Sequence, residues 1–195
     1  MSTKERILEE ALSLFAQRGY DGTGVDLIAK HVGIKGPSLY KHFTGKEDIM
    51  NSLIQEAERR YAEYFGSEMN IGKIPESKEE FTQMALKKVS FSMNDPVIRK
   101  IRMFLVQEQF RNEYLAEITT KHQLDEVQMI YTKIIEGMME NGLIEKDDPE
   151  LLAAQLISPI MLLVAKADRQ PQCAAEVMKK IEGYVQHFCK VYIKG

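Results

Sequence analysis

The sequence predicts an all-α protein of about nine helices, and three observations support this prediction. Apolar residues recur at helical spacing along nearly the whole chain, and no stretch alternates between polar and apolar residues as a half-buried strand does. The chain opens with Ser2-x-x-Glu5, which is typical of a helix amino terminus. Of its 195 residues, 44% are hydrophobic and 28% are charged, which is sufficient for a folded core.

The first 46 residues are expected to form three helices. An apolar stripe from Ile7 to Phe15 marks the first helix, and a shorter stripe over 25–32 marks the second. The third helix is barely two turns long, with a glycine as its N-cap and a proline at its first position, where the missing N–H costs nothing. The residues expected to bound these helices are Gly19, Gly33, Gly36 and Pro37.

A long helix over 46–65 is predicted next, opened by a second capping box, Thr44-x-x-Glu47. Residues 66–77 contain two glycines and a proline and indicate a loop. Five further helices are expected over 77–93, 96–110, 112–141, 149–168 and 172–193. The chain is thus divided into an amino-terminal domain (1–46), a connecting helix (46–65) and a larger domain (66–195).

Charge differs between these two parts. Residues 1–46 contain seven Lys/Arg and five Asp/Glu, whereas the whole chain has a net charge of -3. A mildly basic end on an acidic protein suits contact with a polyanion through that end only. The two cysteines, Cys173 and Cys189, form neither a disulfide framework nor a metal motif, so no metal or cofactor is expected. The charged amino terminus and the interrupted apolar run 151–167 predict a cytoplasmic protein without a membrane span.

The second and third helices have the dimensions of a helix-turn-helix, with Gly33 in the turn and the first helix as a brace. In such a unit the later helix enters the major groove of DNA. Lys35, Ser38 and Lys41 are expected to face outward, and Leu39 to face inward. The same pattern also fits an ordinary short helix with a solvated basic face, and spacing alone does not separate the two interpretations.

Four quoted segments resemble the tetracycline-repressor (TetR) family of bacterial regulators. They are 15-FAQRGYDGT-23, 28-IAKHVGI-34, 37-PSLYKHF-43 and Gly45-Lys46-Glu47, which occur in the family's order and spacing. The resemblance covers residues 3–50, about a quarter of the chain. It implies an amino-terminal DNA-binding domain followed by a variable helical domain that binds an effector and forms a dimer.

The resemblance also implies roles for individual residues. Tyr40, His42 and Lys46 would bind DNA phosphates, and Thr23 would lie close to the DNA backbone. Gly36, Pro37, Ser38 and Lys41 would lie nearest the bases. Lys41 is the first candidate for guanine recognition, with a phosphate contact as the alternative. The predicted DNA-binding set is Thr23, Lys35, Gly36, Pro37, Ser38, Tyr40, Lys41, His42 and Lys46. Gly24 departs from the family, which often has Ser or Thr there, so a side-chain phosphate contact at that position is not expected, although its backbone N–H could replace it.

The last two helices are candidates for a homodimer interface. Apolar residues over 172–193 are spaced 3, 4, 3, 4, 3, as in a coiled-coil seam, and helix 149–168 is apolar almost all round. The predicted interface residues are Leu156, Ile160, Leu163, Val177, Ile181, Tyr184 and Phe188. An intramolecular core is the alternative explanation of the same pattern.

Large apolar and aromatic residues of the central helices are candidates for an effector pocket. They are Phe81, Met84, Met103, Phe104, Gln107, Phe110, Tyr114, Tyr131 and Met138. Each of them also fits a plain core position. The eleven methionines indicate an adaptable apolar lining, so an apolar or aromatic effector is expected.

Together these patterns favour a ligand-responsive transcriptional regulator that binds a palindromic operator as a dimer and leaves it when a small molecule binds. Repression is the commoner mode in the family that the chain resembles. The alternative is a helical small-molecule-binding or interaction module that does not bind an operator. An enzyme is not expected, because the sequence lacks HExxH, GxSxG, P-loop and GxGxxG motifs.

Overall fold

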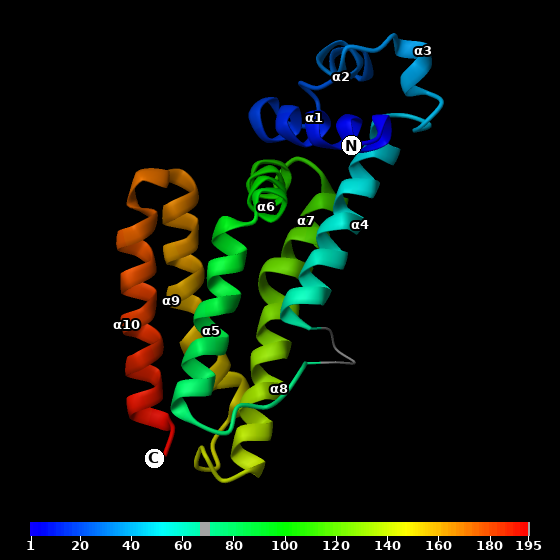
Figure 1. Cartoon of the computed structure of the whole chain (residues 1–195). Coiled ribbons are helices and arrows are strands. Elements are labelled where there is room, and N and C mark those ends of the chain that lie inside the picture. Colours follow the sequence, from blue (N-terminus) through cyan, green and yellow to red (C-terminus); the bar gives the residue numbers. More distant parts are fainter. Residues whose placement is uncertain (67–70, 195) are drawn as a thin grey trace. The chain divides into compact units, whose positions relative to one another are not determined.

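The computed structural model describes residues 1–66 and 71–194, and most of this part of the chain is helical (Figure 1). The all-α prediction is confirmed. The described residues contain ten α-helices where about nine were expected. These are α1 (Thr3–Arg18), α2 (Val25–Val32), α3 (Gly36–Leu39), α4 (Lys46–Phe65), α5 (Lys78–Asn94), α6 (Pro96–Glu108), α7 (Glu113–Thr120), α8 (Glu126–Glu140), α9 (Pro149–Arg169) and α10 (Ala174–Tyr192).

The amino-terminal helices begin and end close to where the sequence predicts. Ser2 and Glu5 form the expected capping box on α1, with the Glu5 amide donating to Ser2 Oγ at 3.2 Å. Gly33 ends α2 in the left-handed conformation, at a φ of 77°. The N-cap of α3 is Lys35 rather than Gly36, and the regular part of α3 is a single turn.

The second predicted capping box names the wrong partner for Thr44. Thr44 pairs with Asp48, whose Oδ2 accepts from the Thr44 amide at 2.8 Å and lies 3.2 Å from the Thr44 hydroxyl. The reason is register. Because α4 begins at Lys46, Asp48 and not Glu47 occupies the third helical position, from which a side chain reaches back to the start of the helix.

The helix predicted over 112–141 is interrupted in its hydrogen bonding. A π-helical segment, Lys121–Asp125, joins α7 to α8. His122 in this segment is buried, and its Nδ1 lies 2.7 Å from Glu126 Oε2. This interruption divides the predicted helix in two and accounts for the additional helix. It was not predicted, because one wider turn leaves the spacing of apolar residues almost unchanged.

Contacts divide the chain into two compact units. The first, here called the head unit, comprises Met1–Tyr61 and Pro96–Thr119; the second, the body unit, comprises Ala62–Asp95 and Thr120–Gly195. The head unit includes α6 and α7, which were expected in the larger domain. Phe15 of α1 stacks on Phe104 of α6, with ring centroids 5.3 Å apart. The functional boundaries 1–46 and 66–195 remain a prediction.

Within the body unit, α5, α8, α9 and α10 pack together around a shared core (Figure 1). The rings of Phe81 in α5 and Phe188 in α10 lie 5.8 Å apart in this core. α9 and α10 run antiparallel, joined by a short 3-10 turn at Pro171–Cys173. The carboxy-terminal end is tied to the loop before α9, because the Lys194 amide donates to the Leu143 carbonyl at 2.8 Å.

α9 begins as predicted, with Asp148 capping its first turn through Oδ1, which accepts from the amides of Glu150 and Leu151. In length and composition α9 could cross a membrane, and among the described helices it alone passes this test. The core helix of a soluble protein also passes it, and the inner side of α9 is buried in the body unit. An outer apolar side of α9 remains exposed, with Leu162 70% exposed.

Candidate nucleic-acid interface

α2 and α3 are held against each other and against α1 by buried apolar side chains. Ile28 and Val32 of α2 and Leu39 of α3 are almost completely buried. The guanidinium of Arg6 in α1 donates to the carbonyl oxygen of Val32. Val32 is the last residue of α2, so this carbonyl has no hydrogen-bond partner within the helix. These contacts fix the orientation of α3, which is the requirement for presenting one of its faces to a ligand.

The outward face of α3 and of the turn that follows it is basic and polar. Leu39 and Phe43 point inward, and Tyr40 between them is 57% exposed. Of the residues predicted to contact DNA here, five are exposed (Lys35, Pro37, Tyr40, Lys41 and His42), while Gly36 and Ser38 are half-buried. Ammonium, imidazole and phenol groups can all donate to phosphate oxygens, and lysine also recognises guanine. The structure therefore brings seven of the nine predicted residues onto one short segment.

The structure corrects the prediction that the side chain of Thr23 contacts the DNA backbone. Its side chain is fully buried, and its hydroxyl donates to the Gly19 carbonyl at 2.9 Å. A side chain without exposed surface cannot contact the DNA backbone directly. Its role is local: it satisfies a carbonyl at the end of α1, in the turn that leads to α2.

Lys46 is already engaged within the head unit. Its Nζ donates to the Tyr20 carbonyl at 2.8 Å and lies 3.9 Å from the centroid of the Tyr20 ring. A lysine ammonium has three donors, so this arrangement leaves donors for a phosphate while restricting where Nζ can lie. Burial raises the pKa of Tyr20, and the nearby carboxylates of Glu47 and Asp21 add to this effect.

Two glycines are required in the α1–α2 turn. A Cβ on Gly22 would lie 2.3 Å from the Arg18 carbonyl oxygen, so no other residue fits. Gly19 has a φ of 73°, and a Cβ there would lie 2.6 Å from Oε1 of Glu108. Glu108 was not singled out from the sequence. The available signal was its position on the buried stripe of α6, three residues after Leu105, where a charge is unusual.

The predicted dimer residues are mostly committed to the core of their own chain. Leu156, Ile160, Val177, Ile181 and Phe188 are all buried in the single chain. Leu163 is half-buried, and Tyr184 is 49% exposed. The alternative explanation thus holds for most of the seam, because that side of α10 packs on α5 and α9 of the same chain. Leu162 of α9 and Val191 of α10 are also exposed, and both lie outside the predicted set.

The nine predicted effector residues fall into two groups in different units. Phe81, Met84, Tyr131 and Met138 belong to the body unit, and all but the half-buried Met84 are core residues. The other five, Met103, Phe104, Gln107, Phe110 and Tyr114, belong to the head unit. Phe104 is part of the head core, whereas Phe110 is 91% exposed. Their spacing did not indicate that α6 packs on α1.

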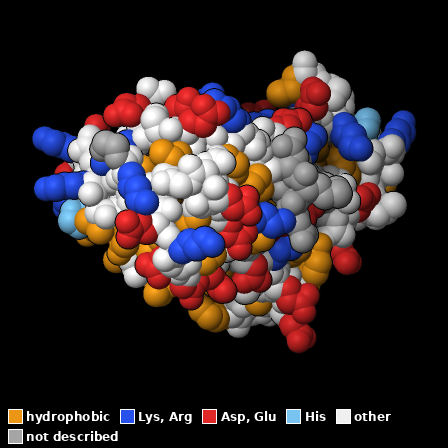
Figure 2. Space-filling view, turned by 90° about the horizontal axis from the view of Figure 1, so that it is seen from below, with side chains coloured by type: hydrophobic (Ala, Val, Ile, Leu, Met, Phe, Trp, Pro, Cys, Tyr) orange, Lys and Arg blue, Asp and Glu red, His pale blue; other side chains and the backbone are white. Residues whose placement is uncertain are grey.

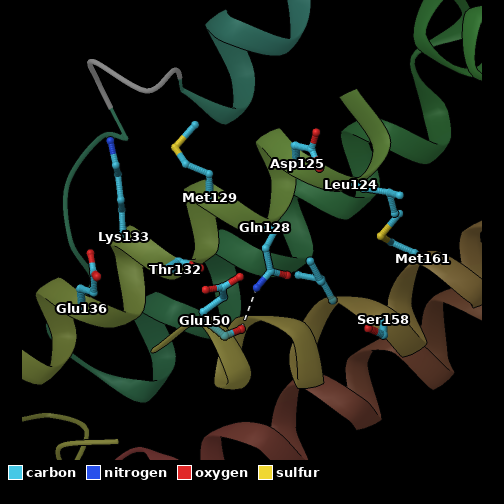
Figure 3. A pocket seen from close by; sticks show the side chains of 11 residues that line it. Leu124, Asp125, Gln128, Met129, Thr132, Lys133, Glu136, Glu150, Ser158 and Met161 are labelled. Atoms are coloured by element: carbon cyan, nitrogen blue, oxygen red, sulfur yellow. Dashed lines mark hydrogen bonds between the residues drawn. The ribbon is translucent and has the colours of Figure 1, made fainter. Parts of the chain in front are cut away.

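Two open grooves lie in the body unit, and none of the nine residues lines either of them. One, of about 560 Å³, lies between α8 and α9, with Met129 and Met161 on its walls (Figure 3). Gln128 reaches across this groove and donates to the Glu150 carbonyl at 2.7 Å. The other, of about 410 Å³, lies between α5 and α10 beside Cys189. Their sizes suit small molecules, but both grooves are open to solvent.

Buried ionisable groups are also present in the body unit. Lys88 lies on the core-facing side of α5 with 8% of its side chain exposed, and its Nζ donates to the Tyr64 carbonyl at 3.4 Å. Burial lowers the pKa of Lys88 to about 8. Burial raises the pKa of Tyr131 and that of the Cys189 thiol. Within the described residues, no cluster of potential metal ligands was found.

The acidic residues of the chain lie mainly outside its first 46 residues. Figure 2, which looks at the molecule from below Figure 1, shows Asp and Glu side chains interspersed with Lys and Arg over the face that it presents. The outward face of α3, with Lys35 and Lys41 exposed, has the charge that suits a polyanion.

Together, the braced α2–α3 pair and the exposed basic face of α3 define a helix-turn-helix DNA-binding protein. Residues 7–53 match the model of the tetR family of bacterial regulatory proteins. The match covers the segment that contains α2 and α3, about a quarter of the chain.

Two transcriptional regulators are similar to this chain, one over its whole length and one over 52 residues. A Bacillus subtilis protein named "Probable HTH-type transcriptional regulator YttP" is similar over the whole chain and 90% of its own length, at 25% identity. IcaR of Staphylococcus epidermidis, a negative transcriptional regulator of the biofilm operon icaADBC, is 44% identical over 52 residues, 27% of this chain and 28% of IcaR. These relatives are named as regulators and not as enzymes.

Solved structures share the fold of the whole chain. SmeT of Stenotrophomonas maltophilia, the repressor of the multidrug efflux pump SmeDEF, has been solved as a complex with triclosan. That complex matches this chain with a TM-score of 0.79, at 15% identity, over 100% of this chain and 93% of SmeT. At this identity the match establishes the fold alone.

Proposed function

We propose that this protein is a cytoplasmic transcriptional repressor that binds a palindromic operator as a homodimer and leaves it when a small molecule binds. The observation that supports this most directly is the outward face of α3. Lys35, Lys41 and His42 are exposed there, whereas Leu39 and Phe43 anchor the same segment in the core. Such a segment can enter the major groove without losing its own packing.

The dimer is inferred from the sides of α9 and α10 that the chain itself leaves uncovered. Leu151 and Leu162 of α9 are 52% and 70% exposed, and Tyr184 and Val191 of α10 are 49% and 54% exposed. Exposed apolar residues on neighbouring antiparallel helices favour burial against a second copy. Two heads spaced about 34–36 Å apart would read half-sites one helical turn apart, and this predicts a palindromic operator.

An apolar or aromatic effector fits the composition of the body unit. Phe81, Tyr131 and Met138 supply aromatic and thioether groups in its interior. SmeT, which shares the fold, has been solved with triclosan, and its repressor activity supports the same mode of control here. An effector that prefers the DNA-free arrangement must weaken DNA binding by the same factor by which DNA weakens effector binding.

Fluorescence anisotropy with a duplex from the gene's own upstream region tests the proposal. A shuffled duplex is the control, and both are titrated at several salt concentrations. We expect selective binding that weakens steeply with salt, because phosphate contacts release counterions. Lys41→Ala should weaken binding, whereas Lys179→Ala, which removes the same charge from an exposed site on α10, should not.

Equal, weak binding of both duplexes by the wild-type protein would count against operator recognition by this segment. The protein would then be better described as a helical small-molecule-binding or interaction module. Effector control is tested separately by screening apolar and aromatic compounds for release of the bound duplex. A bound compound that leaves DNA affinity unchanged would contradict effector control.

A further inference from the structure

The peptide groups on both sides of Tyr20 are held by side chains from two other helices. Its amide N–H donates to Oε1 of Glu108, at the end of α6, at 3.1 Å. Its carbonyl oxygen accepts from Lys46 Nζ, at the start of α4, at 2.8 Å, and also from the Thr23 amide at 3.2 Å. The backbone of Tyr20 therefore links the end of α6 to the start of α4 within the head unit.

The side chain of Glu108 is buried where it accepts the hydrogen bond from the Tyr20 amide. Its side chain is 3% exposed, and it lies on the buried stripe of α6 together with Ile101 and Leu105. A buried carboxylate is costly unless hydrogen bonds compensate for its lost hydration. The Tyr20 amide provides one such bond. Gly19 allows the approach, because any side chain there would collide with the carboxylate.

Lys46 depends on the Tyr20 carbonyl for its placement. A free lysine side chain has many rotamers, and holding it in one of them costs entropy on binding. The hydrogen bond to the Tyr20 carbonyl and the position of Nζ over the Tyr20 ring restrict it before any ligand arrives. A group that is placed in advance binds phosphate with a smaller entropic loss.

We propose that Glu108 is a positioning residue for DNA binding, which holds the Tyr20 backbone in place and through it directs the Lys46 ammonium toward a DNA phosphate. The inference rests on the proposed function as a DNA-binding protein. It does not depend on the sequence of the operator, because a phosphate contact carries no sequence information. Glu108 itself, buried at the end of α6, does not touch DNA.

The test measures how the affinity for a random-sequence 30-base-pair duplex depends on salt. Each phosphate contact adds about 0.9 to the slope of log K against log salt concentration. We expect Glu108→Ala to weaken binding at low salt about 3- to 10-fold, the range for losing one hydrogen bond, and to lower the slope by about one contact. Glu117→Ala, at an exposed site on α7, is the matched control and should leave both unchanged.

Two further variants separate positioning from a general effect on folding. Glu108→Gln keeps the acceptor oxygen and should bind like the wild type. Glu108→Asp keeps the charge but is one methylene shorter, and it should lose the contact as Glu108→Ala does. Partial unfolding of the head would lower affinity at every salt concentration without changing the slope. If Glu108→Ala does not fold, the Gln and Asp variants still decide the question.

Lys46 provides the second half of the test. Lys46→Ala should lower the slope by the same amount, and adding Glu108→Ala to it should have no further effect on the slope, since residues that act through one contact are not additive. Additive losses, or a slope unchanged in Glu108→Ala or Glu108→Asp, would overturn the inference. If the wild-type protein binds no duplex at all, the proposed function fails instead, so the two failures are distinguishable.

Discussion

The hydroxyl of Thr23 donates a hydrogen bond to the carbonyl oxygen of Gly19 at 2.9 Å, and no part of the Thr23 side chain is exposed. The carbonyl of Gly19 directly follows the last residue of α1. A threonine expected near the DNA backbone thus holds together the turn from which α2 starts. Its effect on DNA binding is therefore expected to be indirect.

Thr23→Val should destabilise the protein by about 1–3 kcal/mol, because it leaves the Gly19 carbonyl without this buried donor. Thr23→Ser, which keeps the hydroxyl, should cost less. Urea unfolding followed by circular dichroism measures both. At temperatures where the valine variant is folded, its DNA affinity should be close to that of the wild type. A large loss of affinity in fully folded protein would indicate a direct contact after all.

The glycines of the α1–α2 turn should respond very differently to substitution. Gly22→Ala places a methyl group 2.3 Å from the Arg18 carbonyl oxygen, so the turn must open, and we expect a loss of about 3 kcal/mol or more. Gly24→Ser meets no atom within 4 Å and supplies the side-chain cap that α2 lacks, so it should raise stability by a few tenths of a kcal/mol. Thermal unfolding of the two variants side by side gives the comparison, and equal effects would contradict it.

The contribution of Lys88 to the free energy of unfolding should rise between pH 8 and pH 10, because over this range Lys88 is largely neutral in the folded state and still protonated in the unfolded chain. Its pKa falls to about 8 on burial, below the ordinary value of 10.5, so the unfolded chain binds more protons in this range. Stability therefore increases with pH, by at most about 1.4 kcal/mol per pH unit. The difference in unfolding free energy between wild type and Lys88→Met, measured at each pH, isolates this contribution. A difference that stays constant from pH 8 to pH 10 would contradict it.

Substitutions on the two sides of α9 and α10 should have separate effects. Leu162→Glu, on the exposed side of α9, should weaken the dimer while leaving the fold of each chain intact, because a charge would be buried between the copies. Ile181→Ala, on the buried side of α10, should destabilise the fold by about 2–5 kcal/mol. Sedimentation equilibrium and chemical unfolding distinguish the two effects. A Leu162→Glu protein that remains dimeric would show that α9 is not the contact.

Local sequence patterns predicted most helix limits correctly. Capping residues and glycines act within one turn, so the ends of α1 and α2 could be predicted from a few neighbouring residues. The π-helical segment at Lys121–Asp125 could not, because one wider turn leaves the apolar periodicity almost unchanged. The partner of Thr44 was misassigned for a similar reason. A shift of one residue in the start of α4 decides whether Glu47 or Asp48 can reach back.

The candidate DNA-binding face was predictable for the same local reason. α3 is short, its inward residues are apolar and its outward residues are polar, so side-chain direction follows from the sequence. Thr23 differs from the prediction, and the hydrogen bond that places Lys46 was not predicted, because both side chains are engaged with backbone groups of the α1–α2 turn. The spacing of residues along the sequence does not indicate which carbonyl oxygen will accept a hydrogen bond from a nearby hydroxyl or ammonium group.

By itself, the sequence determined the class of fold, the positions of the helices and the segment most suited to DNA, since these depend on periodicity, capping and the direction of side chains within one helix. Only the tertiary structure decided which helices share a core. It placed α6 against α1, brought Glu108 to the Tyr20 amide 88 residues away, and buried Ile181 within its own chain. An apolar stripe requires burial but does not specify the surface that covers it, and that choice depends on the packing of the whole chain.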